Sequence, residues 1–199
     1  MKLEHYRNML KERLNEDFYR HSLSVAETAY VMAEHLGADT QKAYLAGLLH
    51  DYGKRYTYDQ LLWHAKHLEL HLDWVTRSDA RLMHAPVGAA LLKTELDVSD
   101  AEVIDAVAFH TTGRPGMSLL EKIIYISDYI EIGRDFEGVE VIRLLSLYDL
   151  NKALLAVVEQ TIGSVLKRRL VLHPRSVEFR NSLLKEMQDT CGADGFCGI

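Results

Sequence analysis

Imidazole and carboxylate side chains recur in this sequence at positions where a metal ion could use them. They are spread over residues 21–128 and interrupt segments that are otherwise apolar. The set consists of His21, His50, Asp51, His84, His110 and Asp128. A divalent cation that activates water takes nitrogen and oxygen ligands and keeps one coordination position open for water or substrate. These residue types therefore predict a metal-dependent hydrolytic site, provided that the fold brings them together.

The adjacent pair His50 and Asp51 lies near the end of the apolar segment AYLAGLLHDYGK. A carboxylate at the C-terminal end of a helix faces the negative end of the helix dipole and, once buried, needs a cationic partner. A metal ion is one such partner, and Lys54, three residues further on, is another. The dipeptide alone leaves both interpretations open, because a short motif match is only a hypothesis.

Asp128 is a single acid among the isoleucines of SLLEKIIYISDYIE. An unpaired charge inside an apolar helix face is costly, so a cation must meet this carboxylate. The cation is either a metal ion or one of three basic side chains nearby in the sequence. Those side chains are Lys122, Arg134 and Arg143.

The three remaining histidines of the set are weak signals one by one, because each could be a hydrogen-bonded core imidazole. His21 begins the helical pattern HSLSVAETAYVMAEHL, His84 precedes a proline at the expected start of another helix, and His110 ends AEVIDAVAFH. Side chains at helix ends and on apolar faces can converge from separate helices. The other histidines lie in mixed polar stretches and are expected on the surface. They are His5, His35, His64, His67 and His71.

The elements that must position these residues are helices. Apolar residues recur at helical spacing along most of the chain, and we find no convincing strand-like alternation. Stop and start signals stand where helices need them, at Gly37, Asp39, Thr40, Gly53, Ser99 and Asp100. Each of the three prolines is placed to open a helix or hold a turn, and these are Pro86, Pro115 and Pro174. The pattern predicts an all-α orthogonal bundle of about eight to ten helices.

Length and composition favour a single domain, which we place at residues 1–188, followed by a flexible tail over 189–199. The chain has 199 residues, 48% of them hydrophobic, which is enough for one core without disulfides. The tail is Gly-rich and holds the two cysteines, Cys191 and Cys197, which fits a reducing cytoplasm. The aromatic-rich stretch from Tyr52 to Trp74 is a candidate homodimer surface.

Charge and hydropathy exclude some classes of function. The chain has 23 basic and 29 acidic side chains, for a net charge of −6, so no electrostatic grip on nucleic acid is indicated. A few local cations and a metal ion can still bind a small anion. Neither an export signal nor a stretch of about 20 apolar residues is present, so we expect a cytoplasmic protein without a membrane partner.

Longer motifs around these residues carry a family resemblance. They are AGLLHDYGK at 46–54, LMHAPVGA at 82–89, FHTTGRPGMSLLEKIIYISDYIE at 109–131 and HPRSVEFRN at 173–181. With them the chain resembles the HD-domain hydrolases, whose pattern is H…HD…D. Over roughly residues 15–185 it resembles more closely the bacterial symmetrical bis(5′-nucleosyl)-tetraphosphatases of HD type, the YqeK family.

The resemblance implies an all-helical HD-domain orthogonal bundle that cleaves diadenosine tetraphosphate at its centre into two ADP. It implies iron, as one or two ions, with manganese, cobalt and zinc left open. The implied metal ligands are His21, His50, Asp51 and Asp128. The implied catalytic residues are Asp51, His84 and His110, where the two histidines face the phosphates or complete a second metal position. The candidate substrate-binding residues are Lys54, Thr111, Arg114, Arg134, His173, Arg175 and Ser176.

Two departures from the family pattern concern substrate contacts and loop rigidity. Phe18 stands where many relatives have arginine, and Ile132 stands where relatives often have proline before the arginine at 134. Two other functions stay open at this stage. One is hydrolysis of a different nucleotide, as in a 5′-nucleotidase or a ppGpp-type hydrolase, and the other is non-catalytic nucleotide binding around a structural metal.

Overall fold

The computed structural model describes residues 2–191. Within this range the chain forms eleven α-helices and one 3-10 helix, so the predicted all-α class is confirmed, with slightly more helices than expected. The elements are α1 (Lys2–Arg13), α2 (Glu16–Leu36), α3 (Thr40–Leu49), η1 (Tyr52–Arg55), α4 (Tyr58–His67), α5 (Trp74–Ser78), α6 (Ala80–Leu96), α7 (Ala101–Phe109), α8 (Leu119–Ile130), α9 (Val139–Tyr148), α10 (Leu150–Lys167) and α11 (Pro174–Cys191). Most of the predicted tail, residues 192–199, lies outside the described residues.

Several predicted helix ends are confirmed. Gly37 ends α2 in the left-handed conformation, with φ of 71°, and its N–H donates to the carbonyl of Ala33. Asp39 and Asp100 cap α3 and α7 by accepting hydrogen bonds from backbone N–H groups of the first turn. Pro174 is the first residue of α11, where a missing N–H costs nothing.

Two predicted helix starts are wrong, because a capping residue begins each helix earlier in the chain. α2 begins at Glu16, because Asn15 caps it, so His21 lies inside the helix. α6 begins at Ala80 after the cap at Asp79, which leaves Pro86 in the helix interior instead of at its start.

Gly53 does not end α3, as was predicted, but lies in η1 against α6. A Cβ atom at this position would lie 2.2 Å from the carbonyl oxygen of His84, so only glycine permits this approach. The segment that follows Asp51 is therefore packed directly on the helix that carries His84.

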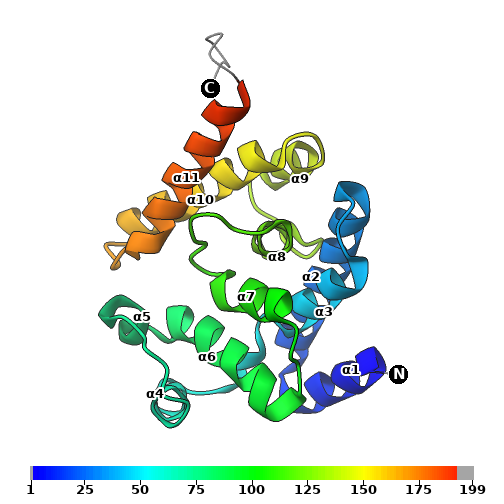
Figure 1. The fold of residues 1–199 in the computed structure, drawn as a ribbon, viewed down its shortest axis with the longest axis vertical. Helices are drawn as coiled ribbons and strands as arrows, with labels where there is room; N and C mark the ends of the chain where they lie inside the picture. The colour runs from blue at the N-terminus through cyan, green and yellow to red at the C-terminus, as the bar shows by residue number, and fades with distance from the viewer. Residues whose placement is uncertain (1, 192–199) are drawn as a thin grey trace.

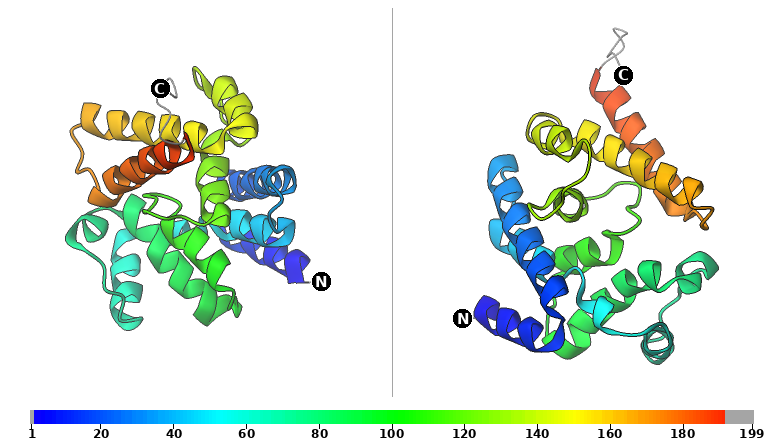
Figure 2. Two further views of the ribbon diagram at one scale, coloured as in Figure 1. Left: turned by 45° about the horizontal axis from the view of Figure 1, so that its top comes forward. Right: turned by 180° about the vertical axis from the view of Figure 1, so that it is seen from behind.

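The helices are arranged around α7 and α8. Figure 1 shows α9, α10 and α11 in the upper part of the molecule, α4, α5 and α6 in the lower part, and α7 and α8 between them. The two further views agree on this arrangement (Figure 2). α8 packs against α2, α3, α7 and α10, so the helices that carry the predicted metal ligands share one core.

The packing of α2 on α3 is particularly close. A Cβ atom at Gly47 would lie 2.8 Å from the Cα atom of Ala26, so the two backbones approach more closely than a larger residue would allow. This crossing brings the N-terminal half of α2 near the C-terminal end of α3. Among residues 2–191, no helix combines the length and the apolar character that crossing a bilayer requires.

Candidate metal centre

Asp51 lies at the middle of the predicted cluster, and its two carboxylate oxygens face two different pairs of histidines. Oδ2 lies 3.6 Å from Nε2 of His21 and 3.2 Å from Nε2 of His50. Oδ1 lies 3.2 Å from Nε2 of His84 and 3.5 Å from Nε2 of His110. The side chain is fully buried. One carboxylate therefore joins four imidazoles that come from α2, α6 and the C-terminal ends of α3 and α7.

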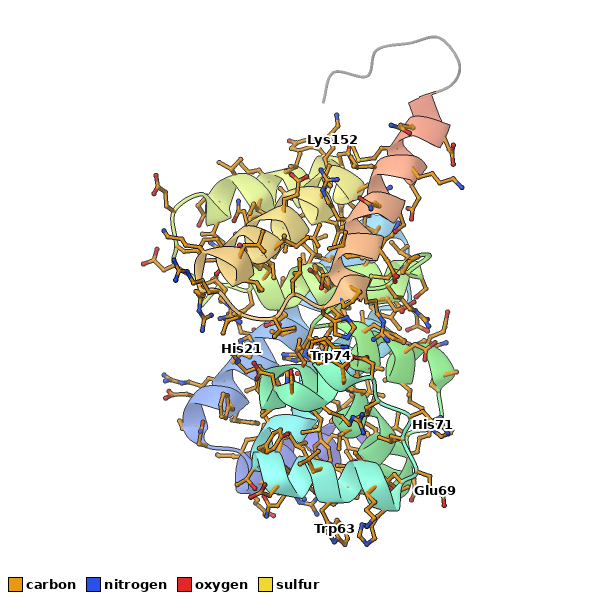
Figure 3. The ribbon with its side chains drawn as sticks, turned by 90° about the vertical axis from the view of Figure 1, so that its left-hand side faces the viewer. His21, Trp63, Glu69, His71, Trp74 and Lys152 are labelled. Carbon is orange, nitrogen blue, oxygen red and sulfur yellow. The ribbon has the colours of Figure 1, made fainter. Side chains whose placement is uncertain are left out.

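Asp128, on α8, completes the cluster on the side of His21. Its Oδ1 lies 3.0 Å from Nε2 of His21 and 3.9 Å from Nε2 of His50. Of the three basic side chains that the sequence offered as partners, Arg134 is the one that meets it, with Nη2 at 2.9 Å. Lys54 likewise meets Asp51, with Nζ 2.6 Å from Oδ2. In Figure 3 His21 lies at mid-height between the lower and upper helices.

The orientation of three imidazoles is fixed by hydrogen bonds at Nδ1. His50 and His110 each have Nδ1 2.7 Å from a carbonyl oxygen three residues earlier in the chain, that of Gly47 and of Val107. His21 has Nδ1 3.2 Å from a carboxylate oxygen of Glu131. With Nδ1–H donating to these acceptors, the unprotonated Nε2 atoms face one another and the two aspartates. This is the tautomer that a metal ligand needs.

The cluster has unmet hydrogen-bonding capacity that fits a cation. Nε2 of His21, Nε2 of His50 and Oδ1 of Asp51 are buried and lack a hydrogen bond of acceptable geometry. Buried polar atoms are normally satisfied, so such a concentration calls for a ligand. The potential ligand atoms form three overlapping groups, and the atoms within each group lie within 4.8 Å of one another. They are His21 with His50 and Asp51, His50 with His110 and Asp128, and Asp51 with His84 and His110.

The charges in the cluster change the pKa values of its members. Burial opposes ionisation of Asp51, but the imidazoles of His50, His110 and His84 around it hold its pKa well below the ordinary value. Burial likewise opposes ionisation of Asp128, and His21 and His50 lower its pKa nevertheless. Burial lowers the pKa of His84, to which the nearby His110 adds. Both carboxylates are therefore ionised at neutral pH, as metal ligands must be.

A cavity of about 320 Å³ opens onto the cluster. Its floor includes His84, His110 and Asp128, and its rim includes two predicted substrate residues, Lys54 and Thr111. Five further lining residues were missed by the sequence analysis, namely Arg81, Tyr125, Tyr129, Val157 and Thr161. Two larger hollows of about 460 and 430 Å³ lie elsewhere on the surface, but neither is lined by the histidines and aspartates of the cluster.

Of the missed residues, two had a signal in the sequence. Arg81 precedes His84 by three residues, which places both side chains on neighbouring positions of one helix face. Tyr125 precedes Asp128 by three residues on α8 in the same way. Thr161 had none, because α10 reaches the cavity only through tertiary packing.

The other predicted substrate residues do not line this cavity and have partners of their own. Nε of Arg114 lies 2.6 Å from Glu121, and its guanidinium group also lies over the ring of Phe109, 4.2 Å from the ring centre. Arg175 approaches the same ring, at 5.3 Å. Among these residues, Arg134 lies beside the cluster because it contacts Asp128.

His173 and Ser176 belong to a compact set of contacts that we call the α11 cap. Nδ1 of His173 accepts a hydrogen bond of 3.1 Å from the backbone N–H of Arg175, and its Nε2 lies 3.0 Å from Oγ1 of Thr76 and 3.2 Å from Oδ2 of Asp73. Ser176 is buried, and its N–H donates to the carbonyl of His173. The α11 cap thus ties α11 to α5.

The histidines that the sequence placed on the surface are mostly exposed. His5, His35, His67 and His71 are exposed, whereas His64 is half-buried between Tyr56 and Trp63. None of these five belongs to the metal-binding groups found among residues 2–191.

Known proteins share both the motif and the fold of this chain. The HD domain family matches residues 18–133. A symmetrical bis(5′-nucleosyl)-tetraphosphatase of Halalkalibacterium halodurans is 40% identical over 90% of this chain and 96% of that relative. This chain belongs to the HD-domain family of symmetrical bis(5′-nucleosyl)-tetraphosphatases. The relationship predicted from the sequence motifs is confirmed.

Further relatives support the membership in this family. The protein of the same name from Bacillus subtilis is 40% identical over 83% of this chain and 88% of that relative. A crystal structure from Clostridium acetobutylicum, described as an HD superfamily hydrolase involved in NAD metabolism, superimposes with a TM-score of 0.90. The two sequences are 40% identical, and the superposition covers 92% of this chain and 97% of the Clostridium chain. The predicted HD-domain helical fold is therefore confirmed.

Proposed function

We propose that this protein is a metal-dependent hydrolase that cleaves diadenosine tetraphosphate at its central phosphoanhydride and releases two ADP. The observation that carries the proposal is the convergence of four imidazoles on Asp51, where buried ligand atoms lack hydrogen-bond partners next to a cavity that His84, His110 and Asp128 line. The activity named for the relatives, which match most of this chain, supports the choice of substrate.

The donor set fits a divalent metal, and His21, His50, Asp51 and Asp128 would hold it. The way in which Oδ1 of Asp51 faces His84 and His110 supports a second position for a cation on that side. Nitrogen and carboxylate oxygen donors suit iron, which we propose as the native metal, although manganese, cobalt and zinc accept the same donors. When bound, the metal supplies Lewis-acid stabilisation of the charge that develops on the phosphate being attacked.

The cationic side chains at the cavity bind and orient the polyphosphate. Lys54 and Arg81 lie at the rim, and Arg134 lies beside Asp128. Breaking the central anhydride leaves additional negative charge on the departing ADP, and fixed cations stabilise that charge because they need no reorganisation during the reaction. Thr111 offers a hydroxyl group to a phosphate oxygen at the same rim.

His84 and His110 can hold a proton at the floor of the cavity. Their Nε2 atoms lie 3.1 Å apart, so a proton on one is shared with the other. Because burial lowers the pKa of His84, this imidazole is neutral at pH 7 and can donate from Nε2–H to a phosphate oxygen without requiring acid conditions. Oδ1 of the ionised Asp51 lies 3.2 and 3.5 Å from these two Nε2 atoms and stabilises a proton that is held there.

Product analysis tests the proposed reaction. Metal-loaded protein is incubated with diadenosine tetraphosphate, and the nucleotides are separated by ion-exchange chromatography. We expect ADP as the sole product, and we expect Asp51→Asn to bind little metal and form no ADP while it retains its helical circular dichroism. Formation of ATP and AMP, or full activity of Asp51→Asn, would contradict the proposal.

A non-catalytic role around a structural metal predicts a different result. In that case wild-type protein binds the nucleotide without turnover, and Asp51→Asn loses its fold instead of its activity. Elemental analysis of protein purified without added metal tests whether the native metal is iron. Zinc or manganese at a stoichiometric level would contradict this assignment.

A further inference from the structure

Glu131 lies just beyond the end of α8 and makes contacts that its sequence position does not suggest. Its side chain is nearly fully buried, with 6% of its surface exposed. One carboxylate oxygen, Oε2, accepts a hydrogen bond of 2.5 Å from the hydroxyl group of Ser24 and one of 2.6 Å from the backbone N–H of Gly133. The other, Oε1, lies 3.2 Å from Nδ1 of His21. Three groups from two segments thus hold one buried carboxylate in place.

The partner of His21 differs in kind from the partners of the other ligand histidines. His50 and His110 use neutral carbonyl groups of their own helices, which no side-chain substitution removes. His21 uses a charged side chain that is 110 residues away in the sequence. A carboxylate that accepts from Nδ1–H orients the ring and increases the electron density at Nε2. Nε2 is the atom that lies 3.0 Å from Asp128 in the metal centre.

The loop that carries Glu131 is itself fixed by one arginine of α9. The guanidinium group of Arg143 donates to the carbonyl oxygens of Ile130, Glu131 and Arg134 at 2.8, 2.7 and 2.8 Å. The same loop supplies Arg134, which pairs with Asp128. The loop therefore reaches the metal centre at two points, through Glu131 to His21 and through Arg134 to Asp128.

We infer that Glu131 is a positioning residue that sets the orientation and the metal affinity of His21. It does not line the cavity, and His21 is the one proposed metal ligand that it contacts directly, while its Oε1 also lies 3.6 Å from Nε of Arg134. The inference rests on the proposed metal-dependent function for its catalytic consequence, but the affinity of the site for a metal ion can be measured without any substrate.

The test compares Glu131→Gln with wild-type protein by titration with Co²⁺, whose visible absorption reports binding. Glutamine keeps the size of the side chain and removes its charge. We expect the dissociation constant for Co²⁺ to rise about 10-fold to 100-fold, the range found when a carboxylate partner of a ligand histidine is lost. We expect kcat to fall by a similar factor while KM changes little, because the cavity is intact.

The matched control is Glu137→Gln, the same substitution at an exposed acid of the following segment. It is expected to keep the wild-type affinity for Co²⁺. A purely structural role for Glu131 would lower the thermal stability of the metal-free protein and leave the Co²⁺ affinity of the folded protein at the control value. That result would overturn the inference.

A second variant, Ser24→Ala, keeps the charge of Glu131 and removes only the hydroxyl group that fixes Oε2. It is expected to weaken Co²⁺ binding in the same direction but less than Glu131→Gln. If Glu131→Gln does not fold, Ser24→Ala decides the matter, and an unchanged Co²⁺ affinity would again overturn the inference. Failure of wild-type protein to cleave diadenosine tetraphosphate would reject the proposed substrate and leave the affinity comparison valid.

Discussion

The metal centre and the α11 cap are both clusters of polar residues near helix ends, and both contain a buried histidine. They differ in whether their polar atoms are satisfied. In the metal centre, Nε2 of His50 and Oδ1 of Asp51 are buried without an adequate partner. In the α11 cap, both ring nitrogens of His173 have partners within the protein. A concentration of unmet buried ligand atoms in one cluster thus indicates a ligand site, whereas a cluster with satisfied atoms indicates structural contacts.

The largest expected effect comes from replacing a histidine of the metal centre with alanine. His50→Ala removes a ligand, and because losing only the partner of a ligand costs 10–100-fold, we expect a loss of metal affinity greater than about 100-fold and a similar loss of turnover. Metal content by elemental analysis and ADP release measure the two quantities. Wild-type metal content in His50→Ala would remove the distinction between the two clusters.

Removal of the metal is expected to reduce both activity and stability. Chelation should abolish ADP release and lower the free energy of unfolding by about 3 kcal/mol, which is the linkage for free metal at about 100 times its dissociation constant. Urea unfolding with and without chelator measures the change. Re-addition of Fe²⁺ or Mn²⁺ should restore both properties, and an identical urea midpoint in the two conditions would count against a bound metal.

The matched substitution in the α11 cap should lower stability and leave the metal centre unchanged. His173→Ala removes the cap of α11, so we expect the free energy of unfolding to fall by about 1–2 kcal/mol. Metal content should stay at the wild-type level, and the loss of stability should be the same with and without chelator, because distant sites act additively. A drop in metal content would show that the cap and the centre are coupled.

The smallest expected effect concerns the acid limb of the stability curve. Burial opposes ionisation of Asp73, but hydrogen bonds from Thr76 and the nearby His173 lower its pKa to about 2. A carboxylate with a lowered pKa stabilises the fold above its unfolded-state pKa of about 4, and this contribution disappears as the pH falls from about 4 towards 2. Because the side chain is 41% exposed, the contribution should stay below about 1 kcal/mol.

Asp73→Asn checks this assignment. The variant should have a lower free energy of unfolding than the wild type at pH 7. Between pH 4 and pH 2 its free energy of unfolding should decrease less than that of the wild type. Parallel pH profiles of the two proteins, measured by urea unfolding, would show that Asp73 contributes nothing to the acid limb.

Much of the site could be predicted because chemistry and local pattern agree. The pair His50 and Asp51 follows an apolar helix, and Asp128 interrupts another, so their cost of burial already pointed to a cation. The fold class followed from helical periodicity and from caps such as Asp39. These features depend on neighbours within one or two helical turns, which a sequence displays directly.

The rest depends on contacts between distant segments. Glu131 is an ordinary acid at a helix end until the fold places it against His21. The interior position of Pro86 follows from the cap at Asp79, which starts α6 ahead of His84, and the cavity wall at Thr161 follows from how α10 packs. The cytoplasmic location, the homodimer and the roles of His173 and Ser176 in substrate binding stay predictions.

Gly53 contributes no functional group, yet its lack of a side chain determines how far Asp51 lies from His84. Any larger residue there would push η1 off α6, because a Cβ atom would overlap the His84 carbonyl. The separation between Asp51 and His84 is therefore set at a position that belongs neither to the proposed ligands nor to the lining of the cavity. In a random-mutagenesis screen for ADP release, substitutions at Gly53 should be as intolerable as those at a ligand.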